Sequence, residues 1–250
     1  IIYTDSSAND SISLYPNIQK HLDQFSKVIT SVNKPYGLHR ARKKESFEGE
    51  KILALRKCVN RPAFSYVNFD SFVSRAYLII RTNRVNQKYL TGLLNSALIK
   101  YWLKYKGKMQ GANFQIDKEP LQQIPIAVPA INVQELIATI VDYVMMASST
   151  KENLSELVSN ETIALFFEKI IDGCVYELYF GEHMKEQEIN IIDSALELIK
   201  PITHLSSDKE KADMILDVFM NIKKTDNSIR NRLDLFTLRS PEILKLIIEG

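Results

Sequence analysis

The spacing of apolar residues changes near residue 130, and this change constrains the fold more than any other feature. Beyond residue 131 apolar positions recur every three or four residues, which is the period of a helix that buries one face. One stripe comprises Val133, Leu136, Ile137, Ile140, Val141, Val144 and Met145, and a second comprises Ile163, Phe166, Phe167, Ile170, Ile171, Cys174, Val175, Leu178 and Tyr179. Ser159 or Asn160 between them can cap the second helix, so we expect an antiparallel helical hairpin over roughly 132–180.

The segments before residue 130 are shorter and of mixed type. Helical spacing occurs in residues 15–29 and 86–105. In contrast, residues 51–59, 64–70 and 76–82 are rich in β-branched and aromatic side chains, which favour strands. This part of the chain therefore predicts helices packed with short strands.

A proline-rich stretch separates the part of mixed segments from the part with a helical pattern. The sequence EPLQQIPIAVPAIN, residues 119–132, places three prolines where neither a helix nor a central strand can continue. The predicted fold class is therefore α+β: a mixed domain over residues 1–128, followed by an all-helical domain over residues 129–250 with the long hairpin.

The formal net charge of +2 hides an asymmetry between the two halves. Residues 1–125 contain 20 lysines and arginines against 9 aspartates and glutamates, a net charge of +11. Residues 126–250 contain 12 against 21, a net charge of −9. Such a split is typical of a part that binds a polyanion joined to a part with another role, although chance clustering on solvated faces is the alternative.

Several classes of protein are disfavoured by the sequence. No apolar run approaches the ~20 residues that span a bilayer, and the first residues do not resemble a secretory leader. The chain begins with Ile1 rather than Met, so we expect a piece of a longer protein. Cys58 and Cys174 lie far apart among apolar neighbours, which predicts buried free thiols and a cytoplasmic protein.

Motifs for catalysis are incomplete. The stretch Asn33-Lys34-Pro35-Tyr36 is close to the Asn-Pro-Pro-Tyr loop of amino-methylating enzymes, but Lys34 removes the stiffness of the first proline. No glycine-rich cofactor loop accompanies it, and no phosphate-binding loop has the required spacing. We therefore assign no catalytic and no cofactor-binding residue.

Metal ligands are not indicated either. His183 lies near Glu182 and Glu186 and could contact a metal from one helix face, but a lone histidine among carboxylates is more often simply solvated. The two cysteines lack zinc spacing, and the Glu-x-Lys patterns in residues 48–51 and 208–213 are not on convincing strands. We therefore assign no metal ligand.

Basic side chains in the first half are interleaved with aromatic and amide residues in three clusters. Lysine and arginine bind phosphates, whereas arginine, histidine, asparagine and glutamine can also bond base edges. All three clusters fall in predicted loops or strand ends, where contact residues usually lie, and we expect them to share one face. The candidate DNA-binding residues are His39, Arg40, Arg42, Lys43, Lys44, Arg56, Lys57, Arg61, Lys106, Lys108, Gln110, Asn113 and Gln115.

The order of several segments resembles a known family. YPNIQKHLDQF, GLHRAR, FEGEKILALRKC, YLTGLLNSALIKYWLK and GKMQGANFQIDKEPLQQIPI follow one another at the spacing seen in the TaqI-like C-terminal specificity domain. This domain is the target-recognition module of adenine-specific DNA methyltransferases and type IIG restriction–modification enzymes. The resemblance covers about residues 12–128.

The resemblance implies a role and a set of partners. A domain of this type binds double-stranded DNA from the major-groove side, opposite an upstream methyltransferase domain of the same polypeptide. That domain flips an adenine and methylates its N6 amine with S-adenosyl-methionine. Type IIG enzymes add a Mg²⁺-dependent nuclease further upstream. The resemblance therefore implies a non-catalytic, cofactor-free segment of a bacterial or archaeal protein.

Two other interpretations remain open at the level of sequence. The first is a helical scaffold for protein–protein interaction, with a basic face that docks an acidic partner. The second is a catalytic fragment such as a nuclease. The DNA sequence that a recognition domain would read depends on loop geometry, so the residues alone do not predict it.

Overall fold

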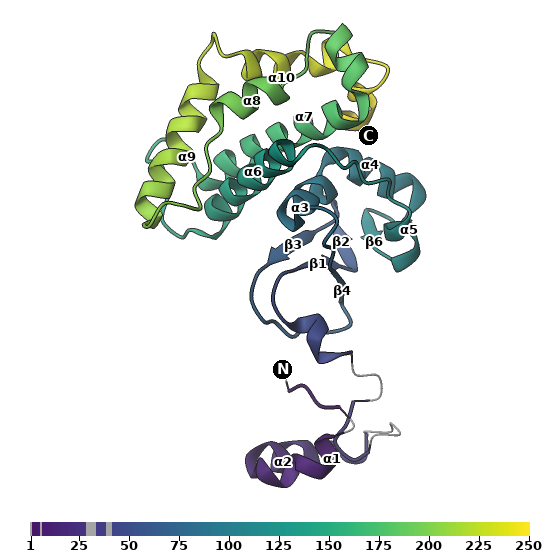
Figure 1. The fold of residues 1–250 in the computed structure, drawn as a ribbon. Coiled ribbons are helices and arrows are strands. Elements are labelled where there is room, and N and C mark those ends of the chain that lie inside the picture. The colour runs from purple at the N-terminus through teal and green to yellow at the C-terminus, as the bar shows by residue number, and fades with distance from the viewer. Residues whose placement is uncertain (1, 6, 29–33, 39–41) are drawn as a thin grey trace. The chain divides into compact units, whose positions relative to one another are not determined.

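The structure is a computed structural model of the chain, and it describes every residue except 1, 6, 29–33 and 39–41. The described residues form two compact units (Figure 1). The first comprises Ile1–Glu50 and Asn68–Arg75, and the second comprises Lys51–Val67 and Ala76–Gly250. The second unit contains all of the strands among the described residues, together with the long helices.

Short helices and an aromatic cluster make up the first unit. Its elements are α1 (Ala8–Ser11), η1 (Ile12–Leu14), α2 (Pro16–Asp23) and η2 (Lys44–Phe47). The ring centroids of Phe47 and Phe72 lie 4.9 Å apart, and Tyr3 packs against both rings. The helix predicted over residues 15–29 is shorter than expected, because the chain turns after Asp23 and Phe25 remains exposed.

The three predicted strand regions each contribute one strand to an antiparallel sheet in the order β3-β1-β4. Strand β1 (Lys51–Leu55) lies in the centre, between β3 (Phe64–Val67) and β4 (Tyr77–Ile80). The continuous burial of β1 explains its nearly uninterrupted apolar run, which is typical of a strand covered on both faces.

A second antiparallel sheet has the order β2-β6-β5. Strand β2 (Lys57–Val59) follows β1 after a break at Arg56, where the chain passes from one sheet to the other. Strands β5 (Lys108–Gln110) and β6 (Asn113–Gln115) form a hairpin whose two-residue turn begins at Gly111 with φ of 63°. Glycine suits the first position of such a turn because a positive φ is required there.

The helix predicted over residues 86–105 is interrupted. It forms α3 (Gln87–Asn95) and α4 (Ala97–Lys106), separated by Ser96 with extended backbone angles. The Ser96 hydroxyl accepts a hydrogen bond from the Ile99 amide, and Asp172 accepts one from the Ala97 amide. These caps satisfy the first amides of α4, so ending one helix and starting another leaves few backbone groups unpaired.

Beyond residue 117 every element is helical. The helices are α5 (Lys118–Gln122), α6 (Ile131–Ser149), α7 (Asn160–Glu186), α8 (Ile192–Leu198), α9 (Asp208–Lys223), α10 (Ser228–Arg239) and α11 (Leu244–Glu249). Helices α6 and α7 pack together as the predicted hairpin, and the Ser159 hydroxyl caps α7. The predicted fold class, α+β followed by helices, is therefore confirmed.

The hydrophobic core continues across the predicted domain boundary at residue 128. Tyr89 and Leu93 of α3 are fully buried in the same cluster as Ile137 of α6. The Tyr89 hydroxyl also donates a hydrogen bond to the Ala127 carbonyl over 2.7 Å. The boundary between the two compact units therefore does not lie at residue 128. The division into a recognition domain over residues 1–128 and a helical domain over residues 129–250 stays a prediction.

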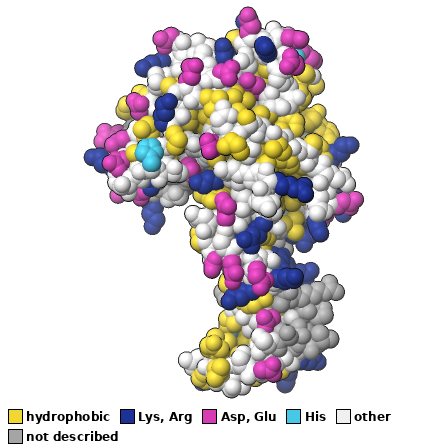
Figure 2. All heavy atoms as spheres, viewed as in Figure 1, with side chains coloured by type: hydrophobic (Ala, Val, Ile, Leu, Met, Phe, Trp, Pro, Cys, Tyr) yellow, Lys and Arg dark blue, Asp and Glu magenta, His cyan; other side chains and the backbone are white. Residues whose placement is uncertain are grey.

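The surface of the helical part mixes apolar and charged groups. On the face drawn in Figure 2, hydrophobic side chains gather over the upper, helical part, among acidic and basic ones. Leu165, Leu238 and Leu246 are among the large apolar residues exposed on these helices. Within the described residues, no helix is both long enough and apolar enough to cross a membrane.

Gly92 determines how closely α3 approaches the hairpin. A Cβ atom at this position would lie 2.9 Å from Ile137 Cγ2 and 3.0 Å from Val141 Cγ2, both on α6. These methyl groups belong to β-branched side chains with restricted rotamers in a helix, so they cannot easily move aside. The sequence pattern alone did not mark this glycine as a packing residue.

We expect Gly92→Ala to lower the free energy of unfolding by about 1–3 kcal/mol, because overpacking exceeds the gain in helix propensity. The matched control is Gly181→Ala in α7, where a new Cβ would meet nothing within 4 Å. The control should leave stability unchanged or raise it by up to ~1 kcal/mol. Urea unfolding of both variants checks the difference, and equal stabilities would contradict the close approach at Gly92.

Candidate nucleic-acid interface

The sheet β2-β6-β5 brings several of the candidate residues to one solvent-facing surface. Its register aligns Lys57, Gln115 and Lys108 in one row across the three strands. A second row contains Val59, Asn113 and Gln110. Because side chains alternate between the faces of a strand, all six point to the same side. We call these six residues the sheet face.

The opposite side of the same sheet is apolar. Cys58, Phe114 and Met109 form the row between those of the sheet face, and all three belong to or pack against the hydrophobic core. Cys58 is a buried free thiol, as predicted, and burial raises its pKa. The buried row fixes which residues point outward, since a slip of one residue would expose Phe114 and bury charged groups.

A chain of polar contacts orders part of the sheet face. The Gln110 amide donates to Gln115 Oε1 over 3.2 Å, and Gln115 Nε2 donates to Asp117 Oδ2 over 3.0 Å. Arg56 Nη2 also donates to Asp117, over 3.0 Å, and Lys108 Nζ lies 3.7 Å from the same carboxylate. Asp117 therefore orients Arg56 and Gln115 at the end of the sheet.

Electrostatics keep this carboxylate charged. The hydrogen bond from Arg56 is the main cause of a lowered pKa for Asp117, with further contributions from Gln115 and Lys108. Asp117 was not among the candidate residues, because one acidic residue in a basic cluster gave no signal in the sequence. Its pairing with Arg56, 61 positions away, depends on the fold.

Asn113 differs from its amide neighbours. Its side chain is exposed and forms no hydrogen bond to another residue in the described part of the chain, whereas Gln110 and Gln115 bond to each other. The donor and the acceptor of the Asn113 amide are therefore both available to a ligand. Lys106, at the end of α4, is also exposed and is separated from the hairpin by Gly107 alone.

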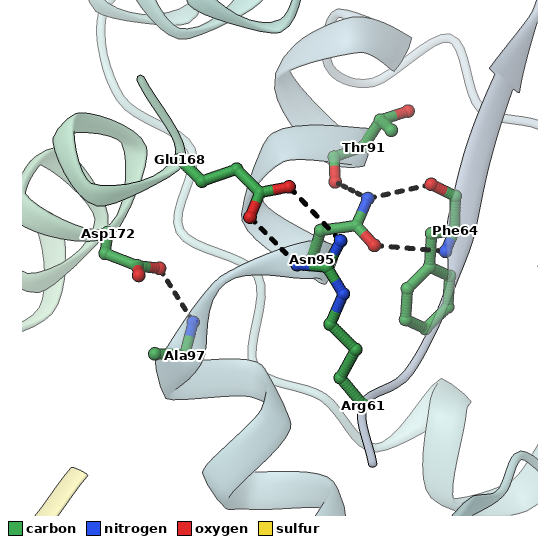
Figure 3. A network of polar contacts seen from close by, with 7 residues as sticks. All are labelled: Arg61, Phe64, Thr91, Asn95, Ala97, Glu168 and Asp172. Carbon is green, nitrogen blue, oxygen red and sulfur yellow. Dashed lines mark hydrogen bonds and ion pairs between the residues drawn. The ribbon is translucent and has the colours of Figure 1, made fainter. Parts of the chain in front are cut away.

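Arg61 lies in a different environment. Its guanidinium donates to both carboxylate oxygens of Glu168 on α7, over 2.8 and 3.4 Å (Figure 3). This pairing raises the pKa of Arg61. Arg61 also borders a cavity of about 750 Å³ that is lined by residues of β3, α3, α6 and α7. In this structure Arg61 therefore pairs with the helical hairpin. The contact of Arg61 with a DNA phosphate stays a prediction.

The same network joins the β3 edge to the helices. Asn95 accepts a hydrogen bond from the Phe64 amide and donates to the Phe64 and Thr91 carbonyls (Figure 3). Nearby, Asp172 Oδ1 accepts a hydrogen bond from the Ala97 amide over 2.7 Å. Burial raises the pKa of Asp172 to about 7, assisted by the charge of Glu168 and opposed by the Ala97 hydrogen bond.

The remaining candidates lie in or near the first unit. Lys43 and Lys44 are exposed at the start of η2, and Arg42 precedes them. The Tyr3 hydroxyl donates to the Arg42 carbonyl over 2.7 Å, which anchors the backbone of this segment. His39 and Arg40 lie outside the described residues. Whether the three basic clusters share one face therefore stays a prediction.

Tyr36, the last residue of the stretch that resembles a methylation loop, is anchored within this unit. The Tyr36 amide donates to Asn9 Oδ1, and the Tyr36 hydroxyl donates to Asp23 at the end of α2. Gln19 of α2 donates to the same hydroxyl. These contacts tie Tyr36 to the N-terminal helices. Among the described residues, no group of three or more histidine, cysteine, aspartate or glutamate side chains could hold a metal ion.

Comparison with known proteins identifies the mixed part of the chain. Residues 13–126 match the family described as the TaqI-like C-terminal specificity domain. This segment belongs to that family. The small sheet, with its polar sheet face, lies entirely within the matched segment. The resemblance stated from the sequence, over about residues 12–128, is confirmed.

A curated relative places the specificity domain in a larger context. The chain is 30% identical over 192 residues to a protein of Methanocaldococcus jannaschii named as a type II restriction enzyme and methyltransferase. The match covers 72% of the chain, so it extends beyond the specificity domain into the helical part. It covers only 15% of the relative, and the chain thus corresponds to a small share of that protein.

The raised pKa of Asp172 predicts a pH dependence of stability. Because the folded-state pKa of about 7 exceeds the ordinary value of 3.8, the stabilising contribution is greatest below about pH 4 and is lost as the pH rises through 7. Asp172→Asn keeps an oxygen acceptor for Ala97 and removes the charge. At pH 8 the variant should be more stable than the wild type, on the order of a few kcal/mol, and this advantage should shrink towards pH 5.

Chemical denaturation between pH 5 and pH 8 measures this difference. The control is Asp213→Asn on α9, the same change at an exposed position, which should alter stability by less than ~0.5 kcal/mol throughout. A constant difference between the wild type and Asp172→Asn across this range would show that the buried carboxyl does not titrate there.

Proposed function

We propose that this chain recognises a specific sequence of double-stranded DNA, as the target-recognition part of a restriction–modification enzyme. The observation that carries this proposal is the sheet face, which collects lysine and amide side chains on one exposed surface of the specificity domain. The excess of basic residues in the first half of the chain supports it, since phosphates supply most of the attraction in DNA binding.

The dimensions of the sheet face suit a DNA groove. Neighbouring strands lie about 4.8 Å apart, so three strands span roughly 10 Å between the outer backbones. The major groove of B-form DNA is about 12 Å wide and admits a two-stranded β-ribbon, so two neighbouring strands of the sheet can enter it together. Two rows of side chains on such a platform can therefore approach base edges while residues at its margins reach the phosphates.

The chemistry of the side chains assigns them different tasks. Lys57 and Lys108 lie on the outer strands, where mobile ammonium groups can contact the two phosphate backbones. Asn113, Gln115 and Gln110 carry planar amides that can pair with adenine or other base edges. Arg42, Lys43, Lys44, Arg56 and Lys106 would add phosphate contacts, and His39 and Arg40 belong to the same proposal on the strength of their sequence context.

The activity of the longer protein is part of the proposal. We infer that an upstream methyltransferase domain of the same polypeptide uses S-adenosyl-methionine to methylate adenine, and that any Mg²⁺-dependent nuclease of the longer protein also lies outside this chain. The name of the Methanocaldococcus relative supports this assignment. Within this proposal, the present chain supplies recognition and carries no catalytic residue.

Salt dependence tests the DNA contact of the sheet face. Lys57 is exposed and forms no ion pair with another described residue, so its ammonium is available to a phosphate. For Lys57→Gln we expect the slope of log affinity against log salt to become shallower by about 0.9, the contribution of one phosphate contact. Fluorescence anisotropy with a labelled duplex, measured from low to high salt, gives this slope.

The matched control is Lys209→Gln, which makes the same change at an exposed position on α9 and should leave the slope unchanged. Polyglutamate serves as a second ligand, because binding driven by charge alone would capture it as tightly as the duplex. Equal slopes for both variants, or equal affinity for polyglutamate and duplex, would contradict DNA recognition by the sheet face and favour docking of an acidic protein.

A further inference from the structure

One apolar residue interrupts the polar sheet face. Val59 is 68% exposed, whereas the other five members of the sheet face are lysine, asparagine or glutamine. A single exposed valine is unremarkable on a protein surface. Its position is informative because the register of β2 and β6 places it directly opposite Asn113.

Opposite residues on adjacent antiparallel strands have Cβ atoms only about 4.5–5.5 Å apart. The methyl groups of Val59 therefore lie beside the Asn113 amide, on the same side of the sheet. Of the three amides on the sheet face, Asn113 alone has no hydrogen bond to the described residues. An available amide and an apolar group thus form one composite surface.

The major-groove edge of an A·T base pair has the complementary composition. Adenine offers N6 as a donor and N7 as an acceptor, which match the oxygen and nitrogen of an asparagine amide. Thymine, on the same edge, projects a 5-methyl group that favours apolar contact. No other base pair of unmodified DNA combines these two features.

We infer that Val59 and Asn113 together read one A·T base pair, with Asn113 on the adenine and Val59 against the thymine methyl group. This inference rests on the proposed function, because it names a base pair within the DNA that the sheet face recognises. It assigns Val59 a role in specificity that no charge or hydrogen-bond pattern in the sequence would indicate. Gln110 and Gln115, which bond to each other and to Asp117, would contribute to neighbouring positions.

The test uses the 250-residue chain and two libraries of randomised duplexes, one made with thymine and one with uracil in its place. Uracil differs from thymine only by the missing methyl group, and pairs with adenine in the same way. Bound duplexes are separated, sequenced and compared with the starting pools. We expect the wild type to enrich an A·T pair at one position, and to enrich it roughly fourfold less in the uracil library, the effect of one buried methyl group.

Three variants assign the effect to the pair of residues. Val59→Ala should select the same position equally in both libraries, because the contact with the methyl group is gone. Asn113→Ala should lose the preference for A·T at that position. Val128→Ala, at another exposed valine outside the sheet face, should behave like the wild type. All four proteins should unfold at similar temperatures, since the altered side chains are exposed.

The outcomes separate this inference from the proposed function. If the wild type enriches a specific sequence but treats thymine and uracil alike at every position, the role of Val59 is wrong and DNA recognition stands. The role is also wrong if Val59→Ala keeps the preference for thymine. If the wild type enriches no sequence in either library, sequence-specific recognition itself is contradicted, and the inference falls with it.

Discussion

Helix α3 is the element on which the rest of the second unit is assembled. Most of its residues are buried, and it packs against both the β3-β1-β4 sheet and the hairpin of α6 and α7. Gly92 permits the close approach to α6, and Asn95 at its end bonds the edge of β3. The specificity domain and the helical part therefore share one core, and the match to the relative also extends across the boundary between them.

A second constraint, the alternation of side chains along three short strands, creates the candidate interface. Cys58, Phe114 and Met109 face the hydrophobic core, so the residues before and after each of them in the strand point towards solvent. The same packing that stabilises the small sheet thus presents lysines and amides to solvent in two ordered rows. The proposed recognition depends on this ordered surface, in which Asp117 holds Arg56 and Gln115 at the end of the sheet.

The sequence predicted the fold class and the helical hairpin because their signals extend over many residues. It did not predict the break at Ser96, where local caps and the distant Asp172 outweigh a continuous helical pattern. Candidate residues such as Lys108 and Gln115 were identified by chemical type, but their alignment with Lys57 depends on the pairing of strands that lie more than 50 positions apart in the sequence. The ion pair of Arg61 with Glu168 is equally non-local, and Val59 lacked any polar signal.

The most direct test of the account is a map of lysine reactivity with and without duplex DNA. Brief acetylation followed by mass spectrometry reports how accessible each ammonium group is. We expect duplex DNA to protect Lys57 and Lys108 of the sheet face, while Lys209 on α9 and Lys151 after α6 remain equally reactive. Unchanged labelling of Lys57 and Lys108 under conditions where the duplex is bound would contradict the claim that this sheet contacts DNA.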